Sequence, residues 1–311
     1  MHWGIMPLHE VLLSLVTDDN DYQRAQAEAA QSAAHANGLG LDIQFAENDA
    51  VLQVQQVLRA LQMKQRRYSA IISEPVGTGM ESAARLAASS GVVWGMLNHD
   101  TTYISSLRRT ARATQFEVTN NHFEMGRIQG QQVAALLPDG GVALYIEGPA
   151  TGGAARLRTE GMLAAKPSNV ELKILKGDWT QANTRKSVAN WLSLGTSRKL
   201  GVAAVICQND AMALGVRDAF ESGMNGTERD QWLSLPITGC DGLPGGGQEL
   251  VKRGILTATI VVPANAGVAV ELAAKALKGA QVPEKTIGLA ASFPPVENLR
   301  SHRSVFAVRT F

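Results

Sequence analysis

Short apolar runs alternate with longer helical stretches along most of the chain, and this alternation restricts the fold more than any other feature. Residues 51–63, for example, carry apolar side chains at Val51, Val54, Leu58 and Leu61, which is a helical period. Alternating strands and helices are typical of an α/β protein with a parallel sheet flanked by helices. The N-terminal third predicts strands at residues 10–16, 41–45, 70–72 and 92–97, separated by helices at 22–36, 51–63 and 79–89.

A second series of the same kind follows, and no low-complexity linker separates the two. Because residues 116–119 at the join have a continuous β pattern, we expect two similar lobes that share a hinge. Ligands of open α/β sheets bind beyond the carboxyl ends of the strands, so two facing lobes would form a cleft lined by the residues after each strand. The second series predicts helices at 121–137, 154–165, 181–194, 211–222, 248–253 and 265–277, and strands at 141–146, 170–175, 202–206, 236–239, 257–261 and 305–308.

The composition excludes several classes of protein. The chain has 311 residues, 29 Lys and Arg against 28 Asp and Glu, and a formal net charge of +1, which argues against a nucleic-acid binder. No apolar stretch approaches the length that spans a membrane. Residues 1–10 contain no Lys or Arg and no secretory signal follows, which predicts either a cytoplasmic protein or an exported one without its leader. Cys207 and Cys240 are too few for a disulfide framework, and we interpret them as small buried residues.

The sequence lacks the motifs of the common enzyme classes. Its six histidines form no HExxH motif, and no Cys/His cluster has metal-ligand spacing. There is no G-x-S-x-G elbow and no Walker A loop, and the glycines at 245–247 are better interpreted as a turn than as a phosphate cradle. We therefore expect a protein without enzymatic activity, metal or cofactor.

Polar and aromatic residues that follow the predicted strands have the chemistry of a polyol-binding site. Sugar hydroxyls require planar partners such as Asp, Asn and Arg, and the apolar face of a sugar ring requires an aromatic surface. The first series supplies Asn20, Tyr22, Glu74, Asn98 and His99, and the second supplies Arg156 or Arg158, Trp179, Asn209 and Asp241.

Several of these residues also have a purely structural interpretation, because the same residue types cap helices, fill cores and occupy loops. Between the two arginines at the start of one predicted helix, we favour Arg156 as the ligand residue. The structural alternatives are helix capping for Asn209 and Asp210, core packing for Trp179 and Tyr22, a solvated side chain for one of the two arginines, and an ordinary loop position for Glu74 and His99.

Several of these residues lie in segments that form a recognisable pattern. The most specific stretch is Gln208-Asn209-Asp210-Ala211-Met212-Ala213-Leu214-Gly215, followed downstream by Asp241-Gly242 and Ala258-Thr259-Ile260. Residues 18–22 and 152–161 and the pair Asp178-Trp179 complete the pattern. Over about residues 10–280 the chain resembles the ribose- and galactose-type periplasmic sugar-binding proteins, which share their fold with the ligand domain of LacI-type regulators.

The resemblance implies a type I periplasmic-binding-protein-like fold, with two lobes joined by a multi-strand hinge. The expected lobes are residues 1–118 with about 260–282, and residues 119–259 with about 283–311, with the ligand cleft between them. The resemblance also implies a monomeric periplasmic protein that closes on a sugar or polyol and delivers it to an ABC-type permease. By position, it assigns ligand contacts to Asn20, Tyr22, Arg156, Trp179, Asn209 and Asp241.

The chain departs from this pattern after the fourth strand, where many relatives carry Asp-Arg and this chain has Asn98-His99. Glu74 also stands where an amide is common, and these departures argue against ribose itself while leaving a polyol or a modified sugar. One alternative is the sensing core of a LacI-type regulator or another cytoplasmic sugar sensor, although no helix-turn-helix precedes residue 10. Another is a sugar-modifying hydrolase in which Glu74 and Asp241 form an acid/base pair.

Overall fold

The chain divides into two compact units, each built from two separate segments. A computed structural model describes residues 9–63, 68–149 and 153–299. Unit 1 comprises residues 1–120 and 264–288, and unit 2 comprises residues 121–263 and 289–311. The chain therefore passes from one unit to the other after residues 120, 263 and 288.

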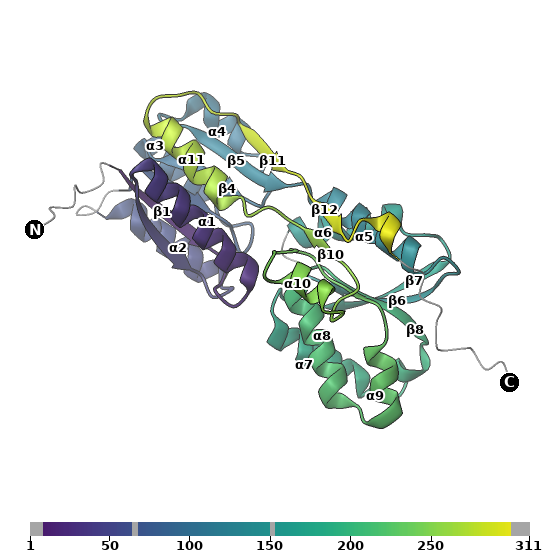
Figure 1. Ribbon diagram of the computed structural model, residues 1–311. Coiled ribbons are helices and arrows are strands. Elements are labelled where there is room, and N and C mark those ends of the chain that lie inside the picture. Colours follow the sequence, from purple (N-terminus) through teal and green to yellow (C-terminus); the bar gives the residue numbers. More distant parts are fainter. Residues whose placement is uncertain (1–8, 64–67, 150–152, 300–311) are drawn as a thin grey trace, which may run out of the picture. The chain divides into compact units, whose positions relative to one another are not determined.

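Unit 1 is built on a six-stranded sheet in which every neighbouring pair is parallel (Figure 1). Alternate side chains of its strands enter different apolar clusters, because successive residues of a strand point to opposite faces. Leu13 packs with Ala30 and Val270, whereas its neighbour Leu12 packs with Val57 and Ala83. In spatial order the strands are β11 (Lys285–Gly288), β5 (Gln115–Asn120), β4 (Val93–Leu97), β3 (Ala70–Ser73), β1 (Glu10–Leu15) and β2 (Gly40–Phe45).

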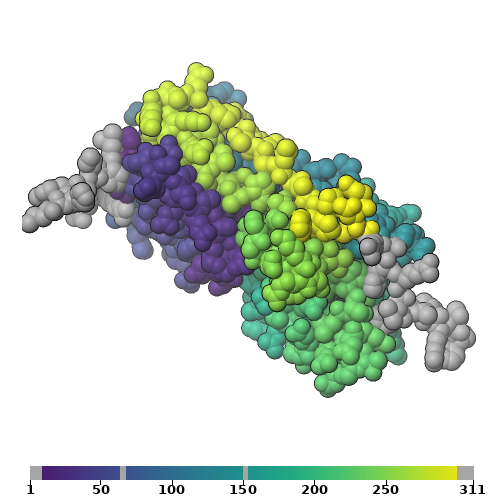
Figure 2. Space-filling model, in the orientation of Figure 1, coloured from purple at the N-terminus to yellow at the C-terminus, as the bar shows by residue number. Residues whose placement is uncertain are grey.

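Helices cover both faces of this sheet. On one face α1 (Asp21–Asn37) packs beside α11 (Ala266–Leu277), although the two are far apart in the sequence, and both reach the surface (Figures 1 and 2). The other face, which carries Leu12, is covered by α2 (Ala50–Gln62), α3 (Glu81–Ser90) and α4 (Ile104–Thr110). The strand–helix alternation of the sequence thus forms a three-layer α/β unit, as the apolar runs predict.

Unit 2 has a four-stranded parallel sheet in the order β7 (Val170–Lys176), β6 (Gly141–Glu147), β8 (Val202–Cys207) and β9 (Ile237–Thr238). A small antiparallel pair, β10 (Thr259–Val261) and β12 (Ala291–Phe293), lies in the same unit. The helices are α5 (His122–Leu136), α6 (Gly153–Ala165), α7 (Gln181–Leu192), α8 (Asp210–Gly223), α9 (Gly226–Leu233) and α10 (Gly247–Lys252), with 3-10 turns at 197–199 and 296–298.

Helices α5 and α6 pack closely because glycines remove the side chains at their contact. A Cβ atom built on Gly126 would lie 2.0 Å from the Arg158 carbonyl oxygen, and one on Gly161 would lie 1.9 Å from the Phe123 carbonyl oxygen. Neither position therefore accepts a larger residue without separating the helices. This close contact fixes the rotation of α6, which carries both candidate arginines.

The structure corrects the sequence prediction at the edges of the sheets. Residues 283–288 were expected in the second lobe, but β11 pairs with β5 in unit 1, with Lys285 opposite Glu117. The short elements α4, α9, β11 and β12 were not predicted, because none contains a long apolar run. The expected strand at 305–308 lies outside the described residues. Within the described ranges, no helix combines the length and the hydropathy that crossing a membrane requires.

Candidate functional site

Asn20 lies after β1, where α1 begins at the carboxyl edge of the unit 1 sheet. Its Oδ1 accepts a hydrogen bond from the Gln23 backbone N–H at 2.9 Å, so its side chain caps the helix. The residue is buried. The cap uses one lone pair of Oδ1, so the second lone pair and the Nδ2 group are the atoms with which Asn20 could contact a ligand.

Tyr22 and Asn98 meet at the same edge, although 76 positions separate them in the sequence. The Tyr22 hydroxyl lies 3.4 Å from Asn98 Nδ2, 3.3 Å from Gln26 Nε2 and 3.3 Å from Asn120 Nδ2. Asn98 directly follows β4 and has a positive φ of 52°, a conformation that asparagine tolerates better than most residues. Tyr22 is 8% exposed, so most of its ring packs inside unit 1.

Glu74 and His99 follow β3 and β4 at this edge. Glu74 is buried, and its backbone is fixed by a bond from its N–H to the Ser14 carbonyl (2.8 Å) and one from Gln53 Nε2 to its own carbonyl (2.8 Å). Burial lowers the pKa of His99, while the Leu97 carbonyl and the Asp100 charge partly oppose this effect. His99 is therefore a neutral imidazole at neutral pH, and it presents one donor and one acceptor.

In unit 2, Arg158 and Trp179 form a pair at the carboxyl edge of the sheet. The Arg158 guanidinium carbon lies 5.3 Å from the Trp179 ring centroid, a cation–π geometry. Arg158 is only 7% exposed and donates from its NH1 group to the Gln208 carbonyl, directly after β8. Its Nε is buried and has no hydrogen-bond partner among the described residues. A buried guanidinium N–H of this kind is suited to an oxygen-rich ligand.

Trp179 itself is held by its backbone and by a close glycine. It has a positive φ of 73°, and its carbonyl accepts a bond from Asn209 Nδ2 at 2.9 Å. A Cβ atom on Gly148 would lie 2.3 Å from Trp179 Cζ2, so the indole occupies the space that this glycine leaves. The ring therefore has a fixed position after β7.

Arg156, which sequence reasoning favoured, lies on a different face of α6. Its NH1 group is 2.6 Å from Glu160 Oε1, one helical turn away, and its side chain is 62% exposed. The structure therefore brings Arg158, and not Arg156, together with Trp179 and Asn209. Residues 150–152, which precede this helix, lie outside the described residues.

Asn209 and Asp210 are both structural to a large extent. Asn209 Oδ1 caps α8 by accepting from the Met212 N–H at 2.8 Å, and its Nδ2 holds Trp179. Asp210 accepts from the Thr259 hydroxyl at 2.7 Å and from the Gly242 N–H at 2.8 Å. Capping, which the sequence offered as an alternative for Asn209, is thus its observed contact, and the same side chain orients the tryptophan.

Asp241 follows β9 with a positive φ of 133°, outside the regions that most side chains adopt. Its backbone is fixed on both sides, by its N–H to the Ile260 carbonyl and by the Val262 N–H to its own carbonyl, both 3.0 Å. A strained backbone that the surrounding structure fixes in this way is often found at a binding site.

Gln208 was not predicted as a site residue, yet it organises this edge. Its Nε2 donates to the Tyr145 hydroxyl at 2.8 Å and to the Thr159 hydroxyl at 3.0 Å, and its Oε1 accepts from the Gly148 N–H at 2.9 Å. These contacts place β6, α6 and β8 in register around Arg158. Its place directly after a predicted strand and before the helix-capping Asn209 is the sequence signal that was available for it.

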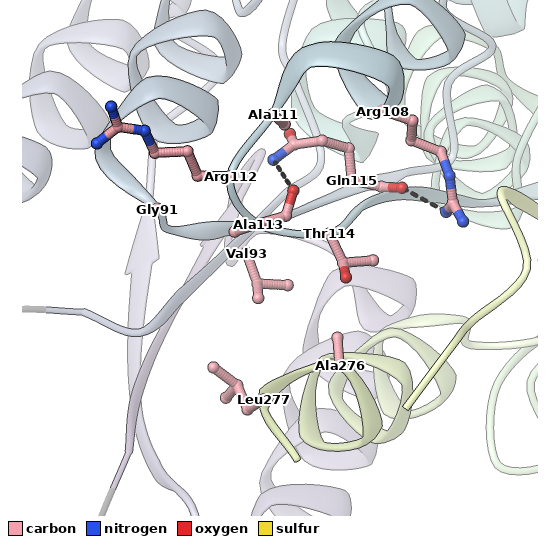
Figure 3. A pocket seen from close by; sticks show the side chains of 10 residues that line it. All are labelled: Gly91, Val93, Arg108, Ala111, Arg112, Ala113, Thr114, Gln115, Ala276 and Leu277. Carbon is pink, nitrogen blue, oxygen red and sulfur yellow. Dashed lines mark hydrogen bonds between the residues drawn. The ribbon is translucent and has the colours of Figure 1, made fainter. Parts of the chain in front are cut away.

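A cavity of about 440 Å³ lies at the opposite, amino edge of the unit 1 sheet (Figure 3). Part of its polar lining is already used: the Arg108 NH1 group donates to the Gln115 carbonyl at 2.7 Å, and Gln115 Nε2 donates to the Ala113 carbonyl at 3.2 Å. None of the predicted site residues lines it.

Within the described ranges, no group of His, Cys, Asp and Glu side chains is arranged to hold a metal ion. Burial raises the pKa of the Cys207 thiol and of the Cys240 thiol, and both residues are fully buried. The two thiols are therefore protonated at neutral pH and are suited to packing.

Comparison with known proteins assigns the family. A family model described as the periplasmic binding protein domain matches residues 11–281. The chain therefore belongs to the periplasmic binding protein family. Its two units of parallel sheet flanked by helices form the type I fold of such proteins, as the sequence segments predicted.

Curated relatives match part of the chain. A putative rhizopine-binding protein of Rhizobium meliloti is 28% identical over 192 residues, which cover 60% of this chain and 59% of that protein. The ribose import binding protein RbsB of Salmonella typhimurium is 32% identical over 162 residues, 51% of each chain. The chain thus spans between half and three-fifths of the length of these relatives.

Solved structures match over nearly the whole chain and show the fold. An ABC transporter solute binding protein from Bacillus halodurans C-125 with bound myo-inositol has a TM-score of 0.76 and 23% identity, with 95% of this chain and 97% of that chain covered. A galactofuranose binding protein has a TM-score of 0.77 and 20% identity, with 94% and 98% covered.

Proposed function

We propose that this chain is a solute-binding protein that captures a sugar or polyol and presents it to an ABC-type permease. The observation that carries the proposal is the Arg158–Trp179 pair at the carboxyl edge of the unit 2 sheet. A buried guanidinium and an indole ring, 5.3 Å apart, supply the charged donor and the apolar face that a polyhydroxylated ring requires.

The carboxyl edge of unit 1 supplies complementary groups. Asn20, Glu74, Asn98 and His99 are an amide, a carboxylate, a second amide and a neutral imidazole, and the first three are buried. In this proposal one ligand contacts both edges, and Arg158 takes the role that the sequence assigned to Arg156. Asn209 orients Trp179, and Asp241 contributes a carboxylate acceptor.

The mechanism is equilibrium binding without chemical turnover. Binding removes water from the polar groups, and each hydrogen bond that a charged group makes to the ligand contributes about 1.5–3 kcal/mol. The ligand favours whichever arrangement of the two units allows both edges to contact it, and the permease recognises that arrangement.

The relatives support this ligand class. The similar proteins are named for binding rhizopine, ribose, myo-inositol or galactofuranose, and the family to which the chain belongs is one of binding proteins. We further propose that the protein acts as a monomer in the periplasm. Cell fractionation tests the compartment, and light scattering on the purified protein tests the oligomeric state. A stable dimer in the cytoplasm would instead favour the alternative function, the sensing core of a LacI-type regulator.

The test of the ligand class is thermal unfolding of ligand-free protein against a panel of D-ribose, L-arabinose, D-fructose, D-allose, myo-inositol and glycerol. A compound present at 100 times its dissociation constant stabilises the native state by about 2.7 kcal/mol. For a protein of this size the midpoint then rises by several degrees. A selective rise supports the proposal. A flat panel contradicts it, and so does the appearance of a new product when a bound compound is incubated with the protein.

A further inference from the structure

The side-chain amide of Gln208 is fully buried, and two backbone groups determine its orientation. Its Nε2 group donates to the Ala155 carbonyl at 3.0 Å, and its Oε1 accepts from the Gly148 N–H at 2.9 Å. A carbonyl only accepts and a backbone N–H only donates, so a flipped amide would lose both bonds inside the protein. The hydroxyls beside the amide can rotate, and they follow this orientation.

One end of the Gln208 amide is bonded to the helical turn that carries Arg158. Ala155 and Thr159 lie in α6 on either side of Arg158, and the Thr159 hydroxyl oxygen is 3.0 Å from Gln208 Nε2. The backbone carbonyl of Gln208 also accepts a bond from the Arg158 NH1 group. The same residue therefore holds the turn of the helix and the guanidinium that projects from it.

The other end of the amide is bonded to the backbone on which the Trp179 ring packs. The Gly148 N–H donates to Gln208 Oε1, and a Cβ atom on Gly148 would lie 2.3 Å from Trp179 Cζ2. The backbone position of Gly148 therefore limits how deeply the indole can lie. Asn209, the next residue in the chain, donates from its Nδ2 to the Trp179 carbonyl at 2.9 Å. Gln208 and its neighbour thus fix the ring from two directions.

We propose that Gln208 is a positioning residue of the sugar site, which holds the Arg158 guanidinium and the Trp179 indole in one fixed arrangement without touching the ligand. The inference rests on the proposed function, because it requires Arg158 and Trp179 to contact the ligand. Gln208 is 0% exposed, so its side chain acts on affinity only through these two residues. A site that is ordered before binding loses less conformational freedom when the ligand arrives.

The decisive variant is Gln208→Met, which keeps the length of the side chain and removes both its donor and its acceptor. Isothermal titration uses the panel compound with the largest wild-type thermal shift. We expect the dissociation constant to rise roughly tenfold, because the turn of Arg158 and the backbone under Trp179 are no longer tied together.

The matched control is Gln129→Met, which removes a second fully buried glutamine amide from the same unit. Gln129 Nε2 donates to the Cys207 carbonyl at 2.9 Å, and its Oε1 accepts from the Tyr145 hydroxyl at 3.1 Å. Gln208 Nε2 lies 2.8 Å from the same hydroxyl. Both variants are expected to lower thermal stability, and only Gln208→Met to weaken binding. Equal weakening by the two overturns the positioning role.

A spectroscopic measurement separates positioning from a general loss of stability. The fluorescence of Trp179 is obtained in ligand-free protein as the difference between each variant and the same variant carrying Trp179→Phe. We expect Gln208→Met to shift this difference spectrum and Gln129→Met to leave it unchanged. A wild-type difference spectrum in Gln208→Met overturns the proposal, because the indole would then not depend on Gln208.

Should Gln208→Met fail to fold, Thr159→Val replaces it in the titration. This substitution keeps the shape of the side chain and removes the hydroxyl that lies 3.0 Å from Gln208 Nε2 and 2.8 Å from Glu147 Oε1. We expect a severalfold weaker affinity than in Gln129→Met, and an equal affinity overturns the positioning role.

Wild-type affinity in Gln208→Met overturns this inference while leaving the proposed function intact. If the wild-type protein binds none of the six compounds, the proposed function fails and this inference fails with it.

Discussion

The sharpest prediction concerns two arginines that lie two residues apart on α6. We expect Arg158→Ala to weaken sugar or polyol binding strongly and Arg156→Ala to leave it unchanged. Arg158 is 7% exposed and lies over Trp179, whereas the Arg156 side chain is 62% exposed and pairs with Glu160. The two substitutions remove the same side chain from the same helix, so each serves as the control for the other.

The magnitude follows from the contacts. One hydrogen bond from a charged donor contributes about 1.5–3 kcal/mol, which corresponds to a roughly 10- to 150-fold change in Kd. The stability change of Arg158→Ala is smaller than its contacts suggest. The lost cation–π contact, about 0.5–2 kcal/mol, is offset by the removal of a buried charge. For Arg156→Ala the exposed ion pair contributes at most about 0.5 kcal/mol to folding and nothing to binding.

The assay is isothermal titration of both variants with the panel compound that stabilises the wild type most, together with urea denaturation to confirm that each variant is folded. Arg158→Lys is a second variant that keeps the charge but loses the planar fork, and it is expected to bind with intermediate affinity. The reasoning is refuted if Arg156→Ala weakens binding as much as Arg158→Ala does.

Three further predictions test the surroundings of the site. Gly148→Ala should displace the Trp179 indole, because the new Cβ would lie 2.3 Å from Cζ2; weaker ligand binding and a shifted tryptophan emission are expected, and an unchanged spectrum would contradict this contact. Asn209→Ala should lower stability by about 1 kcal/mol through loss of the α8 cap, which calorimetry would detect as a midpoint lower by roughly 2–4 °C. The pKa of His99 is lowered by burial, so below its ordinary value near 6.5 the unfolded chain binds more protons than the native one, and stability should rise with pH through that window. His99→Gln should flatten this rise in urea titrations between about pH 5 and pH 7, and an unaltered slope would show that another group causes it.

Strands with an apolar run or a clear alternation could be predicted from the sequence, including the edge strands β2 and β7, but the short polar edge strand β11 could not. Residues 10–16 were expected as a strand because the segment is apolar on both faces, and β1 (Glu10–Leu15) lies in the middle of its sheet with neighbours on both sides. By contrast, β11 (Lys285–Gly288) is an edge strand with alternating exposed residues and no apolar run. Only its pairing with β5 makes it a strand, and that pairing joins segments more than 160 residues apart.

The candidate site was predictable as a set of loops but not as a set of contacts. Asn20 and Asn209 were expected to contact a ligand, and the structure shows that each also caps a helix through its Oδ1. Helix capping and sugar binding require the same short amide at the same place, directly after a strand, so residue type cannot distinguish them. Only the bonded partners show which atoms of each amide remain for a ligand.

For the two arginines, however, the sequence did contain the deciding signal. Ala155, Arg158 and Met162 are spaced three and four residues apart, so they share one face of α6, and all three are buried. Arg156 lies outside this phase and is exposed. The rotation of the helix is fixed at Gly161, where close contact with α5 turns this face inward. An arginine that lies on the apolar face of its own helix is buried with that face, and its buried charge then requires polar partners. Here the Gln208 carbonyl and the Trp179 ring supply two of them, and the buried Nε has no hydrogen-bond partner among the described residues.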